Sequence, residues 1–206
     1  NDLKKYPKKL GDDIKICKKN KVDYLYIPSF REVYSWKVKK KKFPKIKNIM
    51  EQKFRNGHFI GVLKVIEKLS DIIPAEKMYL GKKDFQQLKI IKDFFNLNKI
   101  KTKIIECKTI RDKNGLALSS RNKLLNQKDL VKATNIIKFV KNIKSKKYSI
   151  YKKKVFIKQY LIKNKVNFDY VENIDVKKFK PSNKKSLNSK IFIAFYLKKI
   201  RLIDNI

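Results

Sequence analysis

The sequence predicts an α/β fold, in which a parallel sheet covered by helices precedes a smaller α+β domain. In the N-terminal part, short apolar runs alternate with segments whose apolar residues recur at helical spacing. In the C-terminal part, two helical segments come first and strand-like segments follow. The pattern changes near residues 122–125, so we expect domains over residues 1–122 and 123–206.

The N-terminal domain is expected to alternate strands and helices. Residues 10–20 predict a short helix, and residues 23–28 predict a strand because four large apolar residues follow one another there. The Lys-rich run 37–47 contains Pro44 and predicts a loop. The remaining expected elements are a helix from Phe59, a strand over 77–80 that Gly81 turns, a helix with Leu88, Ile91, Phe94 and Phe95 on one face, and a strand over 101–109.

The C-terminal domain is expected to be a helix pair followed by strands. The predicted elements are helices over 127–143 and 151–164, strands over 168–174 and 191–197, and an extended end over 200–206. The segment 177–190 is rich in Lys, Ser and Asn and contains Pro181, so it predicts a loop.

The formal net charge is +37, from 55 basic and 18 acidic residues, which by itself indicates a polyanion partner. The basic residues are almost all Lys, however, and only five are Arg. Readers of nucleic acid depend on the planar, bidentate Arg fork. We therefore interpret the Lys excess as a solvated surface and expect no specific nucleic-acid partner, with nucleic-acid binding left as an alternative function.

The chain has two cysteines, Cys17 and Cys107, far apart and without a partner motif. Two lone cysteines are typical of a reducing, cytoplasmic protein rather than a disulfide framework. His58 is the single histidine, and no metal-ligand cluster is present. The sequence also contains no apolar run long enough to span a membrane, so no membrane partner is expected.

The segment from Gly81 to Gln87 predicts a phosphate-binding turn between a strand and a helix. Free backbone N–H groups at a helix N-terminus attract anions, and Lys82 and Lys83 add full charges. Asp84 and Gln87 are three residues apart and therefore face the same side of the helix. The alternative is that Asp84 merely caps the helix while the two Lys residues are solvated.

Two further segments carry polar residues suited to a nucleotide cleft. Ser119, Ser120 and Arg121 follow a strand and a loop, and two hydroxyls beside an Arg suit phosphate. The alternative for these residues is a helix cap. Arg55 and His58 stand at the expected entrance of the helix from Phe59, although a lone His is more often structural than catalytic. Physical reasoning alone does not name a reaction from these segments.

The ordered set of motifs resembles the pantothenate synthetases (pantoate–β-alanine ligases), from end to end of the chain. The motifs that carry the resemblance are residues 2–7, 28–34, 55–62, 81–87, 109–122 and 201–205. The resemblance implies a Rossmann-like nucleotidyltransferase domain followed by a C-terminal lid domain. It also implies ATP and Mg²⁺, the substrates (R)-pantoate and β-alanine, a pantoyl-adenylate intermediate with release of pyrophosphate and then AMP, and a homodimer.

The resemblance also implies roles for individual residues. Lys83 stabilises the transition state at the α-phosphate, and Arg121 is the second catalytic residue. Gln87 binds pantoate, with Tyr6, Arg55 and His58 at the edge of the substrate region. The implied ATP-binding residues are Gly81, Lys82, Lys83, Asp84, Ile110, Leu118, Ser119, Ser120 and Arg121.

One departure from the family pattern is large. The family's His-x-Gly-His motif and an early substrate-binding Gln do not occur in this sequence, and His58 belongs to a different motif. We therefore expect an incomplete Rossmann-like domain that lacks adenylation activity as it stands. A non-catalytic remnant of the enzyme is the alternative. At four positions this sequence has a different residue from the one usual in the family. Asn56 stands where Pro is usual, Gln52 and Lys64 where Gly and Thr are usual, and Lys198 where Gly is usual.

Overall fold

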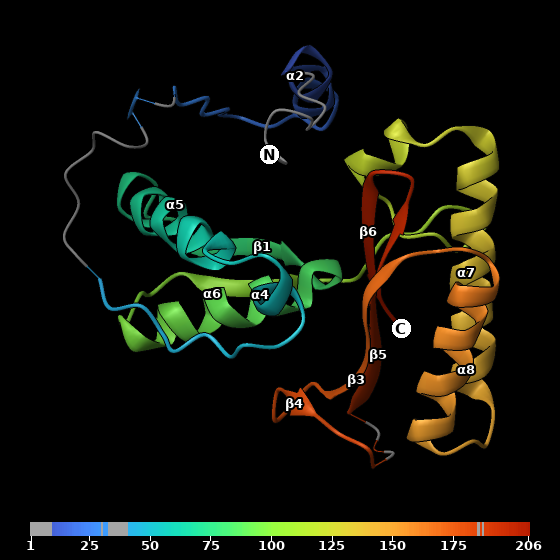
Figure 1. Cartoon of the computed structure of the whole chain (residues 1–206). Helices are drawn as coiled ribbons and strands as arrows, with labels where there is room; N and C mark the ends of the chain where they lie inside the picture. The colour runs from blue at the N-terminus through green and yellow to red at the C-terminus, as the bar shows by residue number, and fades with distance from the viewer. Residues whose placement is uncertain (1–9, 30, 33–40, 185, 187) are drawn as a thin grey trace.

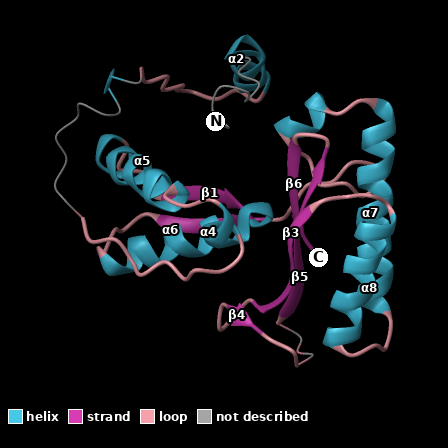
Figure 2. Ribbon diagram, viewed as in Figure 1, coloured by secondary structure: helices cyan, strands magenta, loops and turns pink. Residues whose placement is uncertain are grey.

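The computed structural model describes residues 10–29, 31–32, 41–184, 186 and 188–206. Figures 1 and 2 show a two-stranded sheet with its helices beside a four-stranded sheet flanked by a pair of long helices. Tyr6 lies outside the described residues, as does part of the motif at 28–34.

The elements of the N-terminal part follow the predicted order from the helix at His58 onward. They are α2 (Leu10–Lys19), α4 (Glu51–Phe54), α5 (His58–Ile72), β1 (Lys77–Gly81), the 3-10 turn η1 (Lys82–Asp84), α6 (Phe85–Leu97) and β2 (Lys103–Cys107). Strands β1 and β2 pair in parallel, with Gly81 opposite Cys107. The predicted helix over 10–20 and both strands of this sheet are confirmed.

The core of this part lies between α5, α6 and the two strands. Phe59 and Leu63 of α5 meet Ile91 and Phe94 of α6, and all four are at most 1 % exposed. Phe59, Ile91 and Phe94 belong to the helical stripes that the sequence predicts, and Leu63 is an additional core position. The stripe holds the start of α6 against the end of β1, where the phosphate-binding turn was expected.

The strand predicted over residues 23–28 is wrong. No residue from 22 to 28 is in a strand, and Tyr24 is 93 % exposed. The physical reason is that a strand needs a neighbouring edge and a face to bury, and side-chain preference alone supplies neither. Among the described residues the parallel sheet therefore has two strands rather than three.

The C-terminal part begins with a 3-10 turn and a helix pair and ends in an antiparallel sheet. Its elements are η2 (Ser120–Leu124), α7 (Gln127–Ser145), α8 (Ile150–Lys163), β3 (Phe168–Asp175), β4 (Lys180–Pro181), β5 (Ser189–Leu197) and β6 (Ile200–Asn205). The strand order is β4-β3-β5-β6. The segment 177–190 was expected to be only a loop, but β4 pairs there with the end of β3. A Pro is tolerated in β4 because that strand lies at the sheet edge.

Strand β5 is buried on both faces, which explains its nearly continuous apolar run. Ile191, Ile193 and Phe195 point to the core shared with α7 and α8, which lie along one face in Figure 1. Phe192 and Ala194 point the other way, into a second cluster. The sheet therefore separates the helix pair from the N-terminal part.

The second cluster joins the two parts of the molecule. Met50, just before α4, and Phe85, at the start of α6, pack against Tyr170 and Phe192 of the sheet. The ring centroids of Phe85 and Phe192 are 5.7 Å apart. The turn η1 before α6 is thus fixed against the C-terminal sheet. A domain boundary at residue 122 stays a prediction.

Among the described helices, none combines the length and the apolar character that a membrane crossing requires.

Candidate functional site

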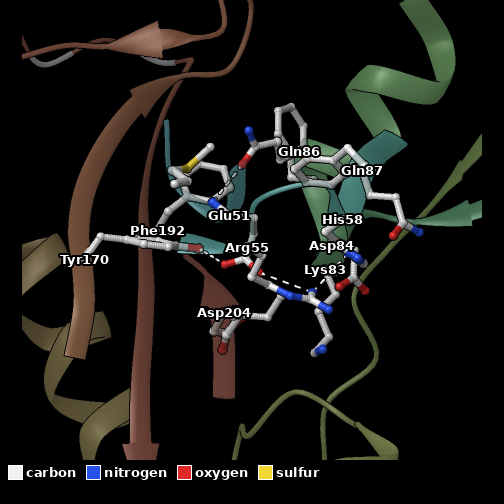
Figure 3. Close-up of a pocket in the computed structure, with 14 residues that line it drawn as sticks. Glu51, Arg55, His58, Lys83, Asp84, Gln86, Gln87, Tyr170, Phe192 and Asp204 are labelled. Atoms are coloured by element: carbon white, nitrogen blue, oxygen red, sulfur yellow. Dashed lines mark hydrogen bonds and ion pairs between the residues drawn. The ribbon is translucent and has the colours of Figure 1, made fainter. Parts of the chain in front are cut away.

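Two neighbouring cavities lie where the end of β1 meets the end of β6. They enclose about 380 and 320 Å³ of empty space, including the solvent at their mouths. Lys83 and Asp204 line both of them. Figure 3 shows the first cavity, whose walls come from α4 and α5, from the start of α6, and from the C-terminal strands. A single Lys therefore stands between two polar hollows.

The strand–turn–helix geometry predicted for Gly81 to Gln87 is confirmed, but the turn does not begin at Gly81. Gly81 is extended (φ −73°, ψ 133°), and the chain turns in η1. A Cβ atom built on Gly81 would meet nothing within 4 Å. Its backbone is therefore accessible from the side on which a side chain would otherwise stand.

The two adjacent Lys side chains have different surroundings. Lys82 Nζ lies 2.9 Å from Glu106 Oε2 on β2, and Glu106 also pairs with Lys92. The hydrogen bond from Lys92 and then that from Lys82 lower the pKa of the Glu106 carboxyl below its usual value. Lys82 thus belongs to a surface charge network, whereas Lys83 lines both cavities.

Asp84 and Gln87 both line the first cavity, as their spacing predicts. Asp84 is the N-cap residue of α6, but its side chain makes no capping hydrogen bond. The interpretation of Asp84 as a mere helix cap is therefore wrong. Gln86 differs from Gln87: it is buried, its Oε1 accepts from the Glu51 N–H at 3.0 Å, and its Nε2 donates to the Ile49 carbonyl. Gln86 holds α4 in place, and Gln87 faces the cavity.

Arg55 and His58 meet at the entrance of α5, as expected. Arg55 Nη1 lies 3.0 Å from His58 Nε2 and 3.7 Å from Glu51 Oε2 (Figure 3). Arg has only donors, so His58 Nε2 accepts, and the neutral ring carries its proton on Nδ1. Gly57 precedes the helix with φ 74°, a left-handed conformation that favours glycine. Both side chains line the first cavity.

The Ser119 to Arg121 segment forms the wall of the second cavity. Ser119 Oγ accepts from the Arg121 N–H at 3.3 Å and caps η2. The helix-cap interpretation therefore describes Ser119 correctly. The same turn brings Ser119 and Arg121 to the cavity that Lys83 also lines.

Five of the residues expected to bind nucleotide do not line either cavity: Gly81, Lys82, Ile110, Leu118 and Ser120. Lys82, Leu118 and Ser120 are sequence neighbours of residues that do, whereas Gly81 and Ile110 are not. The Ile110 carbonyl accepts from the Leu118 N–H at 2.9 Å, and the Ile110 side chain is 66 % exposed.

The sequence did not reveal a buried polar network beside the first cavity. Arg201 donates to both Glu51 oxygens, at 2.7 and 2.8 Å, and its Nε donates to Asp169 at 2.7 Å. Tyr170 adds a hydrogen bond to Glu51 at 2.7 Å. The partners are separated by up to 150 residues, so no local pattern connects them. The sequence indicated only one member of this pair, because Arg201 belongs to the motif at residues 201–205 and Glu51 belongs to none of the motifs.

Two pKa values in this network are set by opposing effects. Burial alone would raise the pKa of the Glu51 carboxyl, but the hydrogen bonds and charge of Arg201 outweigh it, and the pKa lies below its usual value. Burial, together with the Glu51 carboxylate, raises the pKa of Tyr170 well above its ordinary value. Glu51 is therefore a buried anion held between the two parts of the molecule.

The described residues contain no group of three or more His, Cys, Asp or Glu side chains able to hold a metal ion. Three carboxylates line the first cavity. Glu51 is engaged by Arg201 and Asp204 by Arg111, and both are buried, whereas Asp84 is exposed. A divalent cation with protein ligands alone does not fit this site.

Comparison with known proteins identifies the family. The family model described as "Pantoate-beta-alanine ligase" matches residues 1–206. A pantothenate synthetase from Buchnera aphidicola (subsp. Schizaphis graminum) is 40 % identical over 99 % of this chain and 74 % of its own length. One from Endomicrobium trichonymphae is 38 % identical over 100 % of this chain and, again, 74 % of its own length.

Two solved structures share the fold of this chain. The fold matches a pantothenate synthetase from Thermus thermophilus with a TM-score of 0.90 at 24 % identity, over 100 % of this chain and 77 % of that chain. A pantoate–β-alanine ligase from Francisella tularensis, complexed with β-γ ATP and β-alanine, matches with a TM-score of 0.80 at 36 % identity, over 100 % of this chain and 72 % of that chain. The chain belongs to the pantoate–β-alanine ligase family.

Proposed function

We propose that this site serves the ATP-dependent condensation of (R)-pantoate with β-alanine. The expectation that the sequence lacks adenylation activity without a His-x-Gly-His motif is the competing prediction, and the exchange assay below decides between them. The pantoate carboxylate attacks the α-phosphate of ATP, the bond to pyrophosphate breaks, and pantoyl adenylate forms. The β-alanine amine then attacks the acyl carbon, AMP leaves, and the amide of pantothenate is made. The observation that carries the proposal is the position of Lys83, between two polar cavities, in a chain that its family matches over its whole length.

We assign the nucleotide phosphates to the region between Lys83 and Arg121. Charge that develops on the α-phosphate is stabilised by fixed cations, and such groups contribute more in a cavity than in water. Lys83 comes from η1 and Arg121 from η2, so the two cations approach from separate segments. Ser119 adds a hydroxyl beside Arg121, and the open side of the Gly81 backbone lets a phosphate approach the start of η1.

Pantoate is assigned to the first cavity. Gln87 offers an amide for its hydroxyl groups, and Arg55 with His58 forms the opposite wall. With pantoate here and the phosphates on the far side of Lys83, the reacting carboxylate and the α-phosphate meet at the same cation. This arrangement accelerates the reaction mainly by positioning and charge neutralisation.

Mg²⁺ enters, on this proposal, together with the nucleotide. Mg²⁺ is commonly held by one or two carboxylates plus substrate phosphates, and the exposed Asp84 is the fitting side chain. The ion would neutralise phosphate charge. We also infer a cytoplasmic homodimer, supported by the family and, for the compartment, by the two free cysteines. Light scattering on the purified protein tests the oligomeric state.

Pantoate-dependent exchange between ATP and labelled pyrophosphate tests the adenylation step. We expect Lys83→Ala to reduce exchange by about 10²–10³-fold, the effect of removing one preorganised electrostatic group. Lys89→Ala is the matched control, because it removes the same charge from the following helix α6, where Lys89 pairs with Asp93 and lines neither cavity. Equal losses in both variants would contradict the role of Lys83.

Binding measurements beside the exchange assay separate the enzyme from its two alternatives, a non-catalytic remnant and a nucleic-acid-binding protein. Binding of MgATP without pantoate-dependent exchange would identify a non-catalytic remnant. A basic nucleic-acid-binding protein would instead bind DNA or RNA with an affinity that falls steeply as salt rises. We expect no such specific binding in a filter-binding titration.

A further inference from the structure

The last two residues of β6, Asp204 and Asn205, contact the two segments assigned to the nucleotide. Asn205 bonds to η1, and Asp204 bonds to Arg111 in the loop that leads to η2. The Asn205 side chain is 3 % exposed. Its Nδ2 donates to the Lys82 carbonyl at 2.8 Å and to the Lys83 carbonyl at 2.9 Å, and its Oδ1 accepts from Lys190 Nζ at 3.2 Å. A single buried amide thus uses both of its donors on the backbone of η1.

Asp204 makes the second connection. Its carboxylate accepts two hydrogen bonds from Arg111, at 2.6 and 2.9 Å, and a third from the Asn205 N–H at 2.7 Å. Arg111 also donates to the carbonyls of Gly115 and Asn205, at 3.1 and 3.2 Å. Arg111 and Gly115 belong to the loop that leads to Ser119 and Arg121. The two neighbouring residues therefore connect segments that are about thirty positions apart in sequence, one carrying Lys83 and the other leading to Ser119 and Arg121, and all three residues line the second cavity.

We propose that Asn205 is a positioning residue that fixes Lys83 relative to Arg121, an inference that rests on the nucleotide site proposed above. Asn205 donates directly to the Lys83 carbonyl, so the Lys83 backbone, from which the Lys83 side chain extends, is fixed relative to the end of β6. Asp204 fixes the Arg111–Gly115 loop to the same end of β6. The C-terminal strand thereby sets the separation between the two phosphate-binding cations.

A short η1 has little ability to hold this geometry by itself. It has three residues, and its N-cap Gly81 makes no side-chain capping hydrogen bond. The two hydrogen bonds from Asn205 connect the carbonyls of this short turn to the end of β6. Loss of the amide donors would leave both carbonyls without these partners and release the turn that carries Lys83.

The test uses Asn205→Asp and Asn205→Leu, with Asn173→Asp and Asn173→Leu as matched controls. Asn173 is also 3 % exposed and lies on β3 of the same sheet, and its Nδ2 donates to the Ser182 carbonyl at 2.8 Å. Both pairs of variants remove a buried amide that bonds to backbone, but only Asn205 contacts η1. Backbone hydrogen exchange over residues 81–85 and the dissociation constant for MgATP are measured in all four.

We expect faster exchange over residues 81–85 and about tenfold or weaker MgATP binding in the Asn205 variants only, since two hydrogen bonds of ordinary strength are lost. Asn173 variants of comparable thermal stability are expected to retain both wild-type properties. Unchanged exchange over 81–85 in the Asn205 variants, or the same changes in the Asn173 variants, would overturn the inference. If the wild-type protein bound no MgATP, the proposed function would fail, while the exchange measurement would still decide the role of Asn205.

Discussion

Replacing Arg201 with Leu is the most informative perturbation of the fold, because this side chain joins the C-terminal sheet to α4. It makes two hydrogen bonds to Glu51 and one to Asp169. The side chains of Glu51 and Asp169 are only 9 % and 14 % exposed. The substitution therefore leaves Asp169 without the cation that it accepts from, and leaves the more deeply buried Glu51 with only Arg55, whose Nη1 lies 3.7 Å from Glu51 Oε2.

The expected magnitude follows from that burial. Removing one partner of a buried ion pair typically destabilises a protein by about 3–5 kcal/mol, because the other charge stays buried. Tyr170 continues to donate to Glu51, so we expect the lower end, ~3 kcal/mol. In a chain of this length that corresponds to a fall in Tm of roughly 6–12 °C.

Lys154→Leu provides the control. Lys154 pairs with Glu172 at 2.7 Å, but those side chains are 22 % and 31 % exposed. We expect less than ~1 kcal/mol there, the usual range for a solvated pair. Urea unfolding followed by circular dichroism measures both variants. A loss below about 1 kcal/mol for Arg201→Leu, or equal losses in the two variants, would refute the view that the buried network holds the two parts together.

Three further predictions concern single positions. Gly81→Ala is expected to leave thermal stability almost unchanged, since its Cβ meets nothing within 4 Å, but to weaken MgATP binding measurably; Gly11→Ala, equally open in α2, should not affect binding. Lys198 in the β5–β6 hairpin has a left-handed backbone conformation (φ 53°), which costs a residue with a side chain free energy that Gly does not pay. Lys198→Gly should therefore raise the Tm by a few degrees although the surface ion pair with Asp129 is lost, and a lower Tm would contradict this expectation. Finally, the pKa of Glu51 is lower in the folded protein than its unfolded value of 4.5, so the ionised carboxylate stabilises the fold fully above pH 4.5, and this stabilisation is lost as the pH falls through the folded pKa. Glu51→Gln should therefore reduce the pH dependence of the free energy of urea unfolding below about pH 4.5. An unchanged pH dependence would contradict this role of Glu51.

Most of the fold could be predicted from local pattern. The apolar positions from Phe59 onward, and the stripe of Ile91 and Phe94, indicated the two helices of the parallel unit, because helical periodicity is set by which face is buried. The run of apolar residues gave a wrong strand prediction at residues 23–28, where side chains such as Tyr24 are exposed. Strand formation depends on a partner that the local sequence does not encode.

The candidate site was predictable only where its residues lie close together in sequence. The spacing of Asp84 and Gln87, and the order of Ser119 and Arg121, indicated which side chains share a cavity. The contacts of Arg201 with Glu51 span 150 positions, and they arise from the packing of two separate units. No periodicity reports such a contact.

Lys83 and Arg121 are, on this proposal, the two cations that hold the nucleotide phosphates. Calorimetric titration of MgATP into the wild-type protein and into Lys83→Ala, Arg121→Ala and Lys89→Ala tests this directly. We predict binding by the wild type, at least about tenfold weaker binding in each of the first two variants, and unchanged binding in Lys89→Ala, since a charge-assisted hydrogen bond contributes about 1.5–3 kcal/mol. Equal affinity in all four proteins, or no binding by the wild type, would contradict the account.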